Sequence, residues 1–279
     1  MAYYEYDKKS GLLKVLDGKP VRYVQSPHKD AYSGQAISIV TMHFTGSGGV
    51  GGDGDAHWFS DPTAKVSAHF ILGRDGGVIQ CVPLTKKAWH AGTSFWAGKN
   101  NVNDRSFGIE MDNWGLLTVG GDKKYRSYTG EVIDPKIVEL HDKKPWEAYT
   151  AAQYATLSSL LKFMRAEFPS LRELVGHSDI APGRKVDPGP AFRMNVARNA
   201  FEGRGDVQAV DLVHRVSSSG LNLRKFPDAL ADNVITVLPK GQIVTVVWSG
   251  LDGWAYVDVK LASGEIENGW VSSVYLKWG

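Results

Sequence analysis

The hydrophobic and polar positions in the first part of the chain predict strands around one long helix. Residues 36–43 form an apolar, β-branched run, which is typical of a buried strand. Residues 68–82 predict a hairpin with a glycine turn, and residues 106–111 predict a further strand. From Thr150 to Pro169 apolar residues recur at helical spacing, with Thr150 as N-cap and Pro169 as the stop. This part of the chain is therefore expected to have an α/β fold.

Three stretches of this part lack a regular pattern. Residues 1–35 mix polar and aromatic side chains, so we expect an irregular lead-in. Residues 46–54 contain six glycines, which predict a flexible loop. Residues 113–149 are polar and rich in Lys, Asp and Tyr, and their pattern predicts no regular element.

The pattern changes after Phe201. Short runs with alternating apolar residues follow at close spacing, which is typical of a small antiparallel barrel. Gly203-Arg-Gly-Asp206 is interpreted as a hinge, so we expect one domain over residues 1–203 and a second over 204–279. The strands expected in the second domain are residues 221–224, 234–238, 242–248, 254–259 and 269–276.

The composition narrows the classes of protein. Hydrophobic residues make up 43% and charged residues 22%, as in ordinary globular proteins, and the net charge of +2 gives no reason to expect a nucleic-acid partner. No apolar stretch is long enough to span a membrane, so we expect no membrane insertion. The first residues do not resemble a signal peptide, so we expect synthesis in the cytoplasm and delivery by another route. Cys81 is the single cysteine, which excludes an internal disulfide.

One segment carries most of the candidate chemistry. Residues 175–190 contain three prolines and three glycines, which predict a loop of fixed shape and no regular element. His177 and Asp187 suit a zinc site as one imidazole and one carboxylate ligand. Lys185 would add a positive charge beside the metal. A surface loop with ordinary polar residues explains the segment equally well, and the segment alone does not decide.

Further motifs favour the zinc site over the ordinary loop, because they occur together and in the order of a known family. With the segment just described, they resemble the zinc-dependent N-acetylmuramoyl-L-alanine amidases, the phage-lysozyme-type and muropeptide-recycling enzymes that cut peptidoglycan. The resemblance covers about residues 35 to 195. The motifs are Ile39-Val-Thr-Met-His43-Phe-Thr45, Val66-Ser-Ala-His69-Phe, Arg74-Asp-Gly-Gly, Ala88-Trp-His90-Ala-Gly92 and Asn103-Asp-Arg-Ser-Phe-Gly-Ile-Glu110.

This resemblance implies a fold and a set of metal ligands. The fold would be α/β, with a mixed central sheet and flanking helices. The ligands of one Zn²⁺ per chain would be His43, His177 and Asp187, with the fourth position open for water.

The resemblance also implies the groups that carry the reaction. Glu110 would be the general base and Lys185 would help to stabilise the oxyanion. Asp112 competes with Glu110 by composition, but only position 110 matches the motif.

Four more residues are expected to line the substrate groove: His69, Trp89, His90 and Asn103. His69 has a second interpretation, as a histidine behind the ligands or a purely structural one. Some members of the family have a catalytic tyrosine directly before this histidine, where the present chain has Ala68. Because that tyrosine is absent here, the expected catalytic role falls more strongly to Glu110.

The second domain is similar to bacterial SH3-like domains, which commonly attach wall hydrolases to peptidoglycan. The matching residues are Leu221-Asn-Leu-Arg224, Pro239-Lys-Gly241, Gly253-Trp254 and Gly269-Trp-Val-Ser-Ser273. The expected function is therefore hydrolysis of the bond between N-acetylmuramic acid and L-alanine, with peptidoglycan or muropeptides as partner.

Two other functions stay open: the protein could be a non-catalytic peptidoglycan-recognition protein or a zinc endopeptidase of the stem peptide. A phage or prophage lysis enzyme, an antibacterial wall hydrolase and a recycling enzyme are the candidate roles. The barrel argues against recycling, because soluble wall fragments need no anchoring.

Overall fold

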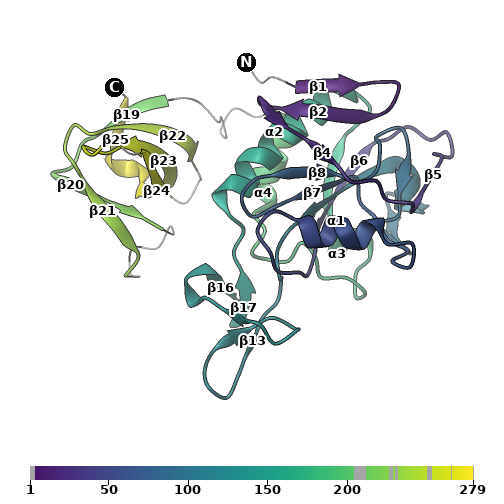
Figure 1. Cartoon of the computed structure of the whole chain (residues 1–279), viewed down its shortest axis with the longest axis horizontal. Coiled ribbons are helices and arrows are strands. Elements are labelled where there is room, and N and C mark those ends of the chain that lie inside the picture. Colours follow the sequence, from purple (N-terminus) through teal and green to yellow (C-terminus); the bar gives the residue numbers. More distant parts are fainter. Residues whose placement is uncertain are drawn as a thin grey trace. The chain divides into compact units, whose positions relative to one another are not determined.

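The computed structural model describes residues 4–203, 212–225, 229, 232–249, 253–264 and 266–278. Contacts divide the chain into two compact units, Met1–Glu202 and Gly203–Gly279 (Figure 1). Residues 204–206 of the expected hinge lie outside the described residues. Among the helices in the described ranges, none is long and apolar enough to cross a membrane.

A six-stranded mixed sheet forms the centre of the first unit. Its first four strands run parallel, and its last two run antiparallel to them. The expected mixed sheet is confirmed, as are the strand near residues 36–43, the hairpin within 68–82 and the strand 106–111. In spatial order the strands are β18 (Glu173–Gly176), β6 (Ile39–Phe44), β12 (Ser106–Met111), β7 (Phe70–Leu72), β8 (Val78–Gln80) and β4 (Arg22–Tyr23).

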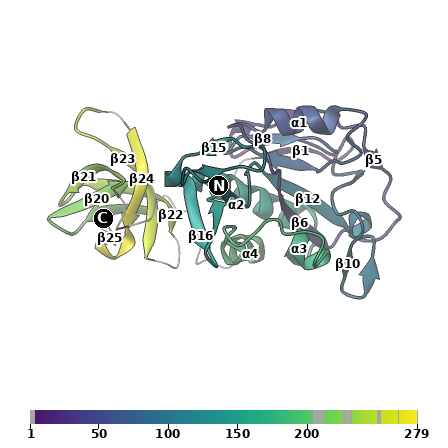
Figure 2. The same ribbon diagram turned by 90° about the horizontal axis from the view of Figure 1, so that it is seen from below.

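The helices divide between the two faces of this sheet. On one face, α1 (Asp53–Ser60) packs Ala56 and Phe59 on Ile71 at the β7–β8 end. On the same face, α3 (His177–Ile180) packs Ile180 on Ile39 at the β18–β6 end. Strands β6 and β12 lie between these two helices (Figure 2).

The opposite face is covered by α2 (Ala151–Glu167), the helix expected from the sequence. Phe107 points to this face and meets Phe168, just beyond the helix, with ring centroids 4.9 Å apart. Thr150 is the N-cap, as predicted: its hydroxyl accepts from the Gln153 amide at 3.1 Å, and the Gln153 side chain accepts from the Thr150 amide. The apolar stripe of the helix is buried against the sheet and α4 (Met194–Glu202).

The expectation of an irregular lead-in was wrong. Residues 4–20 form a three-stranded antiparallel sheet, and two later residues add the edge strand β4 to the central sheet. Tyr4 and Tyr6 pack edge-on against Phe163 of α2, at centroid distances of 4.8 and 5.5 Å. The contact joins residues far apart in the sequence, so a local pattern of only a few residues does not reveal it. They are β1 (Tyr4–Asp7), β2 (Leu12–Leu16) and β3 (Lys19–Pro20).

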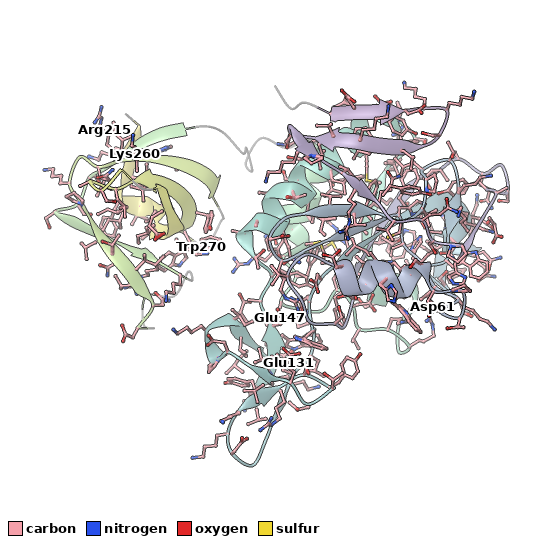
Figure 3. The ribbon with its side chains drawn as sticks, in the orientation of Figure 1. Asp61, Glu131, Glu147, Arg215, Lys260 and Trp270 are labelled. Atoms are coloured by element: carbon pink, nitrogen blue, oxygen red, sulfur yellow. The ribbon has the colours of Figure 1, made fainter. Side chains whose placement is uncertain are left out.

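The glycine-rich stretch is a packed loop that leads into α1, a helix the sequence pattern did not predict. A Cβ atom at Gly48 would lie only 2.5 Å from the Trp114 ring, so this close approach requires glycine. Trp114 begins the polar insertion, which carries Glu131 and Glu147 (Figure 3). The loop and the insertion therefore pack on each other.

The insertion contains five short strands, where the sequence predicted no regular element. They are β13 (Thr118–Val119), β14 (Tyr125–Arg126) and β15 (Val132–Ile133) in one sheet, and β16 (Val138–His141) and β17 (Lys144–Glu147) in a hairpin. The other short elements of the first unit are the strand pairs β5 (Lys29–Asp30) with β9 (Lys87–Ala88) and β10 (Phe95–Trp96) with β11 (Lys99–Asn100), and the 3-10 helices η1 (Val102–Arg105) and η2 (Pro135–Ile137).

The second unit is a seven-stranded antiparallel sheet around its own core. Its described core residues include Leu223, Val257 and Val271, none more than 1% exposed. The last predicted strand, 269–276, is interrupted by the 3-10 helix η4 (Ser273–Tyr275). In spatial order the strands are β21 (Val234–Pro239), β20 (Gly220–Arg224), β24 (Ile266–Ser272), β23 (Trp254–Lys260), β22 (Ile243–Ser249), β19 (Leu212–Val216) and β25 (Leu276–Trp278).

Candidate active site

Three neighbouring parallel strands bring candidate residues to one edge of the central sheet. His43 and Glu110 are register partners near the carboxyl ends of β6 and β12. His177 follows Gly176, the last residue of β18. Functional groups of open α/β sheets commonly gather at this edge, because all parallel strands end there together.

Asp187 reaches the same place from the loop that follows. The sequence predicted no regular element over residues 175–190, which was wrong in part, since β18 ends in this segment and α3 forms one helical turn. The Ser178 amide donates to the Asp187 carbonyl at 2.8 Å. This backbone bond closes the loop and brings Asp187 beside His177.

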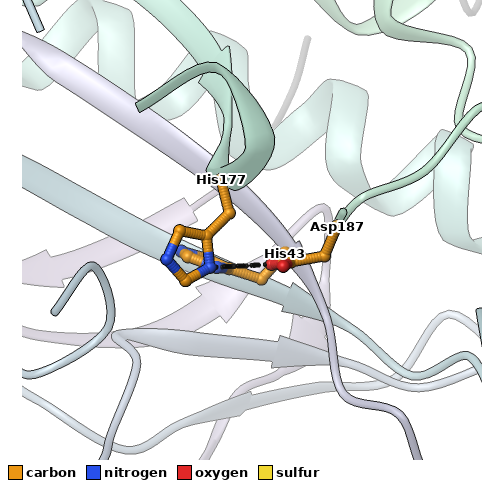
Figure 4. Close-up of side chains that lie close together, drawn as sticks. All are labelled: His43, His177 and Asp187. Carbon is orange, nitrogen blue, oxygen red and sulfur yellow. Dashed lines mark hydrogen bonds and ion pairs between the residues drawn. The ribbon is translucent and has the colours of Figure 1, made fainter. Parts of the chain in front are cut away.

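The three side chains converge on a single point (Figure 4). The Nδ1 atoms of His43 and His177 lie 2.9 Å apart, and Oδ2 of Asp187 lies 3.0 and 2.9 Å from them. All three residues are buried, with at most 6% of any of them exposed. Ligand atoms at tetrahedral angles around zinc lie roughly 3.3 Å apart, so this triangle has about the size of a metal site.

Each ring also has a contact on its far side, at Nε2. Nε2 of His177 donates to the Ala91 carbonyl at 3.2 Å, and Nε2 of His43 lies 3.0 Å from Nδ1 of His90. A neutral imidazole has one proton, so a ring that donates through Nε2 presents a lone pair at Nδ1. Two ring nitrogens and a carboxylate oxygen at this separation require a proton or a metal cation among them.

The charges of the centre follow from its burial. Burial lowers the pKa of His43 to about 4, so this ring is neutral at pH 7. Burial alone would raise the pKa of the Asp187 carboxyl, but its contacts with His177 and His43 outweigh that and hold the pKa below its usual range. The neutral ring of His43, the anionic carboxylate of Asp187 and the ring of His177 beside them form a donor set suited to zinc.

Glu110 lies beside this centre, opposite His43 on the neighbouring strand. Its Oε2 atom is buried and has no hydrogen-bond partner among the described residues. Burial, then the negative charge of Asp187, raises the pKa of Glu110 well above its ordinary value, while Lys185 opposes the rise. The Lys185 side chain is exposed, yet its charge acts on both Glu110 and His43. A buried carboxyl with no partner is costly, which favours a functional role.

Asp112, the competing acid, is tied into another set of contacts. It forms a buried ion pair with Arg74, and Arg74 also pairs with Glu147 of the insertion at 2.7 Å. Burial raises the pKa of Asp112 to about 6. These contacts hold one oxygen of Asp112 to the insertion, whereas its Oδ2 is buried without a partner among the described residues. Of the two acids, Glu110 is the register partner of His43.

His69 is fully buried and fully bonded. Its Nδ1 accepts from the Gly108 amide at 3.0 Å, and its Nε2 lies 3.0 Å from the Lys86 carbonyl, which it can donate to. Tyr32 lies against the same nitrogen at 3.1 Å. These contacts match the second interpretation, a histidine of the fold, and they leave it no free nitrogen for substrate.

The other three residues expected at the groove lie close together. His90 is 8% exposed and lies behind His43, so its described contacts are internal. The Asn103 side chain accepts from the amides of His90 and Ala91 at 3.2 and 2.8 Å, and the partly buried Trp89 donates to Asp30 at 2.8 Å. Their contact with substrate stays a prediction.

Two residues beside the centre were not predicted, and one of them, Arg184, lies 3.4 Å from Nε2 of His177. Ser106 binds His90 at 3.0 Å, and Arg184 donates to the carbonyls of Ala91 and Thr93 at 2.8 and 2.7 Å. A signal for Ser106 existed, because it lies on the same strand face as Glu110, four positions earlier. Arg184 carried none, since a loop arginine is usually solvated.

Fold and site together define a class: an α/β protein with a buried His–His–Asp cluster that could hold a metal ion, at the carboxyl ends of parallel strands. The family model for N-acetylmuramoyl-L-alanine amidase matches residues 33–190, and the model for the bacterial SH3 domain matches residues 219–277. The chain therefore belongs to the N-acetylmuramoyl-L-alanine amidase family and carries a C-terminal bacterial SH3 domain.

Similar proteins include several enzymes of one kind. A 1,6-anhydro-N-acetylmuramyl-L-alanine amidase AmpD of Salmonella typhimurium (strain SL1344) is 37% identical over 143 residues, or 50% of this chain and 60% of that protein. The AmpD of Enterobacter cloacae is 34% identical over 188 residues, or 61% and 84%. The crystal structure of a selenomethionine AmpD derivative has 30% identity and a TM-score of 0.52, and the match covers 70% of this chain and 98% of that one. The chain thus spans about 60% of the length of the Salmonella relative.

The buried His69 predicts a pH dependence of stability. Burial lowers its folded-state pKa to about 4, below the ordinary value of 6.5. As the pH falls from 6.5 to 4, the unfolded chain therefore takes up a proton that the folded chain does not. Stability present at pH 7 is therefore lost toward pH 4, by up to about 3 kcal/mol from this group.

This loss can be measured by urea unfolding of wild type and His69→Gln between pH 7 and 4, since glutamine keeps one donor and one acceptor. The stability advantage of the wild type over His69→Gln should shrink as the pH falls. His57→Gln on the exposed side of α1 is the control, and parallel pH curves for wild type and His69→Gln would refute the prediction.

Proposed function

We propose that this protein is a zinc-dependent amidase that hydrolyses the bond between N-acetylmuramic acid and L-alanine in bacterial peptidoglycan. One observation carries the proposal: a buried His43–His177–Asp187 centre lies beside the unpartnered carboxyl of Glu110. Membership of the amidase family and the names of the AmpD relatives support the identity of the bond.

Zinc fits the residues better than a harder cation does. Two imidazole nitrogens and one carboxylate are a common ligand set of catalytic zinc, whereas Mg²⁺ and Ca²⁺ prefer oxygen ligands only. The metal, when bound, would supply Lewis-acid activation of the substrate carbonyl and of the attacking water.

Glu110 and Lys185 carry the other steps of the proposed reaction. Glu110 accepts the proton of the attacking water and passes it to the nitrogen of the leaving alanine. The raised pKa of Glu110 suits both proton transfers, because the carboxyl must hold the proton after it is taken from water and before it is given to the nitrogen. The ammonium of Lys185 helps to stabilise the negative charge that develops on the carbonyl oxygen.

The products test the proposed bond. Digestion of purified peptidoglycan should release peptides with a new N-terminal alanine, leave the glycan chains uncut, and stop when a chelator removes the metal. Mass spectrometry identifies these ends. New reducing sugar ends would indicate a glycosidase, a later stem residue at the new N-terminus would indicate an endopeptidase, and binding without cleavage would indicate a recognition protein.

The general base has its own test. Glu110→Gln should keep a full complement of zinc and lose about a hundredfold or more in kcat, which is the usual cost of removing such a base. Asp112→Asn is the matched control, because it changes a buried acid of the same strand edge that is paired with Arg74. It should lower thermal stability and leave kcat close to that of the wild type. A normal kcat in Glu110→Gln with a large loss in Asp112→Asn would assign the role to Asp112.

The SH3 domain suggests where the enzyme acts. We propose that residues 204–279 hold the enzyme on the cell wall, which fits a phage or prophage lysis enzyme or another antibacterial wall hydrolase better than a recycling enzyme. The two units have separate hydrophobic cores, and every proposed catalytic residue lies in the first.

Separation of the two domains tests this role. A protein of residues 1–203 should cleave soluble muropeptides at a rate near that of the full chain, and cleave intact sacculi more slowly, because tethering raises the local concentration of enzyme. Residues 204–279 alone should sediment with sacculi. Equal rates of the two proteins on sacculi, with no sedimentation of the isolated domain, would remove the anchoring role.

A further inference from the structure

His90 is a buried histidine that the proposed reaction does not use, yet it touches a proposed ligand. Its Nδ1 lies 3.0 Å from Nε2 of His43, and its Nε2 lies 3.0 Å from Oγ of Ser106. Ser106 is 0% exposed, so water does not compete for these contacts. Each of the two ring nitrogens of His90 thus has one specific partner.

The hydroxyl of Ser106 fixes which group donates and which accepts in the series of hydrogen bonds from Ser106 through His90 to His43. Its hydroxyl donates to the Val102 carbonyl at 2.7 Å, and a hydroxyl has one proton to give. Oγ of Ser106 must then accept the proton from Nε2 of His90. Since a neutral ring has one N–H, Nδ1 of His90 accepts in turn from Nε2 of His43. The proton of His43 therefore lies on the side away from Asp187.

The surroundings keep His90 in this place. Gly108 lies between Ser106 and Glu110 on the same strand face, and a Cβ there would come within 2.5 Å of the His90 ring. Asn103 accepts from the backbone amides of His90 and Ala91. The 3-10 helix η1 supplies both the Val102 carbonyl and Asn103, so one short element holds the ring and its backbone together.

We propose that His90 is a positioning residue: anchored by Ser106, it holds His43 in the tautomer that presents Nδ1 to a metal ion. The inference rests on the proposed metal site and adds the groups that prepare it. Partners behind a metal-binding histidine typically contribute about 10–100-fold in metal affinity. The neighbouring Ala91 carbonyl does the same for His177, so one segment orients both rings.

The test compares variants of the full chain that differ in one acceptor. His90→Leu removes the acceptor for His43, whereas His90→Asn keeps an oxygen near the position of Nδ1. Zn²⁺ affinity, measured by competition with a chromophoric chelator, should fall about 10–100-fold in His90→Leu. It should return to within about threefold of wild type in His90→Asn. Ser106→Ala, which removes the anchor, should fall between them.

A second measurement reads the tautomer directly. In the metal-free wild type, ¹⁵N chemical shifts of the histidine rings should show the proton of His43 on Nε2, and in His90→Leu this preference should be lost. His57→Gln is the control, because it changes an exposed histidine of α1, and it should leave both measurements unchanged.

The outcomes separate this inference from the proposed function. If wild type and His90→Leu bind Zn²⁺ equally and show the same His43 tautomer, the positioning role is refuted while the metal site stands. If the wild type binds no Zn²⁺, the proposed function fails, and the tautomer measurement alone judges the inference. Should His90→Leu not fold, an unchanged affinity and tautomer in Ser106→Ala would overturn the proposal.

Discussion

The structure of the site depends on one constraint: two ring nitrogens and a carboxylate oxygen meet in a buried place. The Nδ1 atoms of His43 and His177 and a carboxylate oxygen of Asp187 lie about 3 Å apart. Such an arrangement is repulsive unless a cation joins it. The surrounding chain serves this constraint, since strand ends fix two of the groups, a closed loop fixes the third, and hydrogen bonds from behind turn the lone pairs inward.

Local sequence pattern predicted those parts of the fold whose stability is local or strongly periodic. Strands β6 and β12, the β7–β8 hairpin and the capped helix α2 all carry their own signals, and the β-rich rhythm of the second unit does too. The N-terminal strands and the insertion carry none, because they depend on partners far along the chain. Tyr4 needs Phe163, and Trp114 needs the space left by Gly48.

The same difference applies to the site. His43, His177 and Asp187 were predicted together, and the structure brings them together, because motif order encodes which residues meet. What no motif states is the direction of a hydrogen bond. The contacts of His90 with His43 and of Arg184 with Ala91 arise from three segments that fold against one another, and the expected substrate contacts of Trp89, His90 and Asn103 remain predictions.

The register of β6 and β12 has a consequence for the thermal stability of this centre. His43 and Glu110 stand opposite each other on adjacent parallel strands, so the backbone ladder of the central sheet sets the spacing between the base and the metal ligand. Neither strand is at an edge of the sheet, and both are buried. The spacing between Glu110 and His43 should therefore persist until the central sheet itself opens.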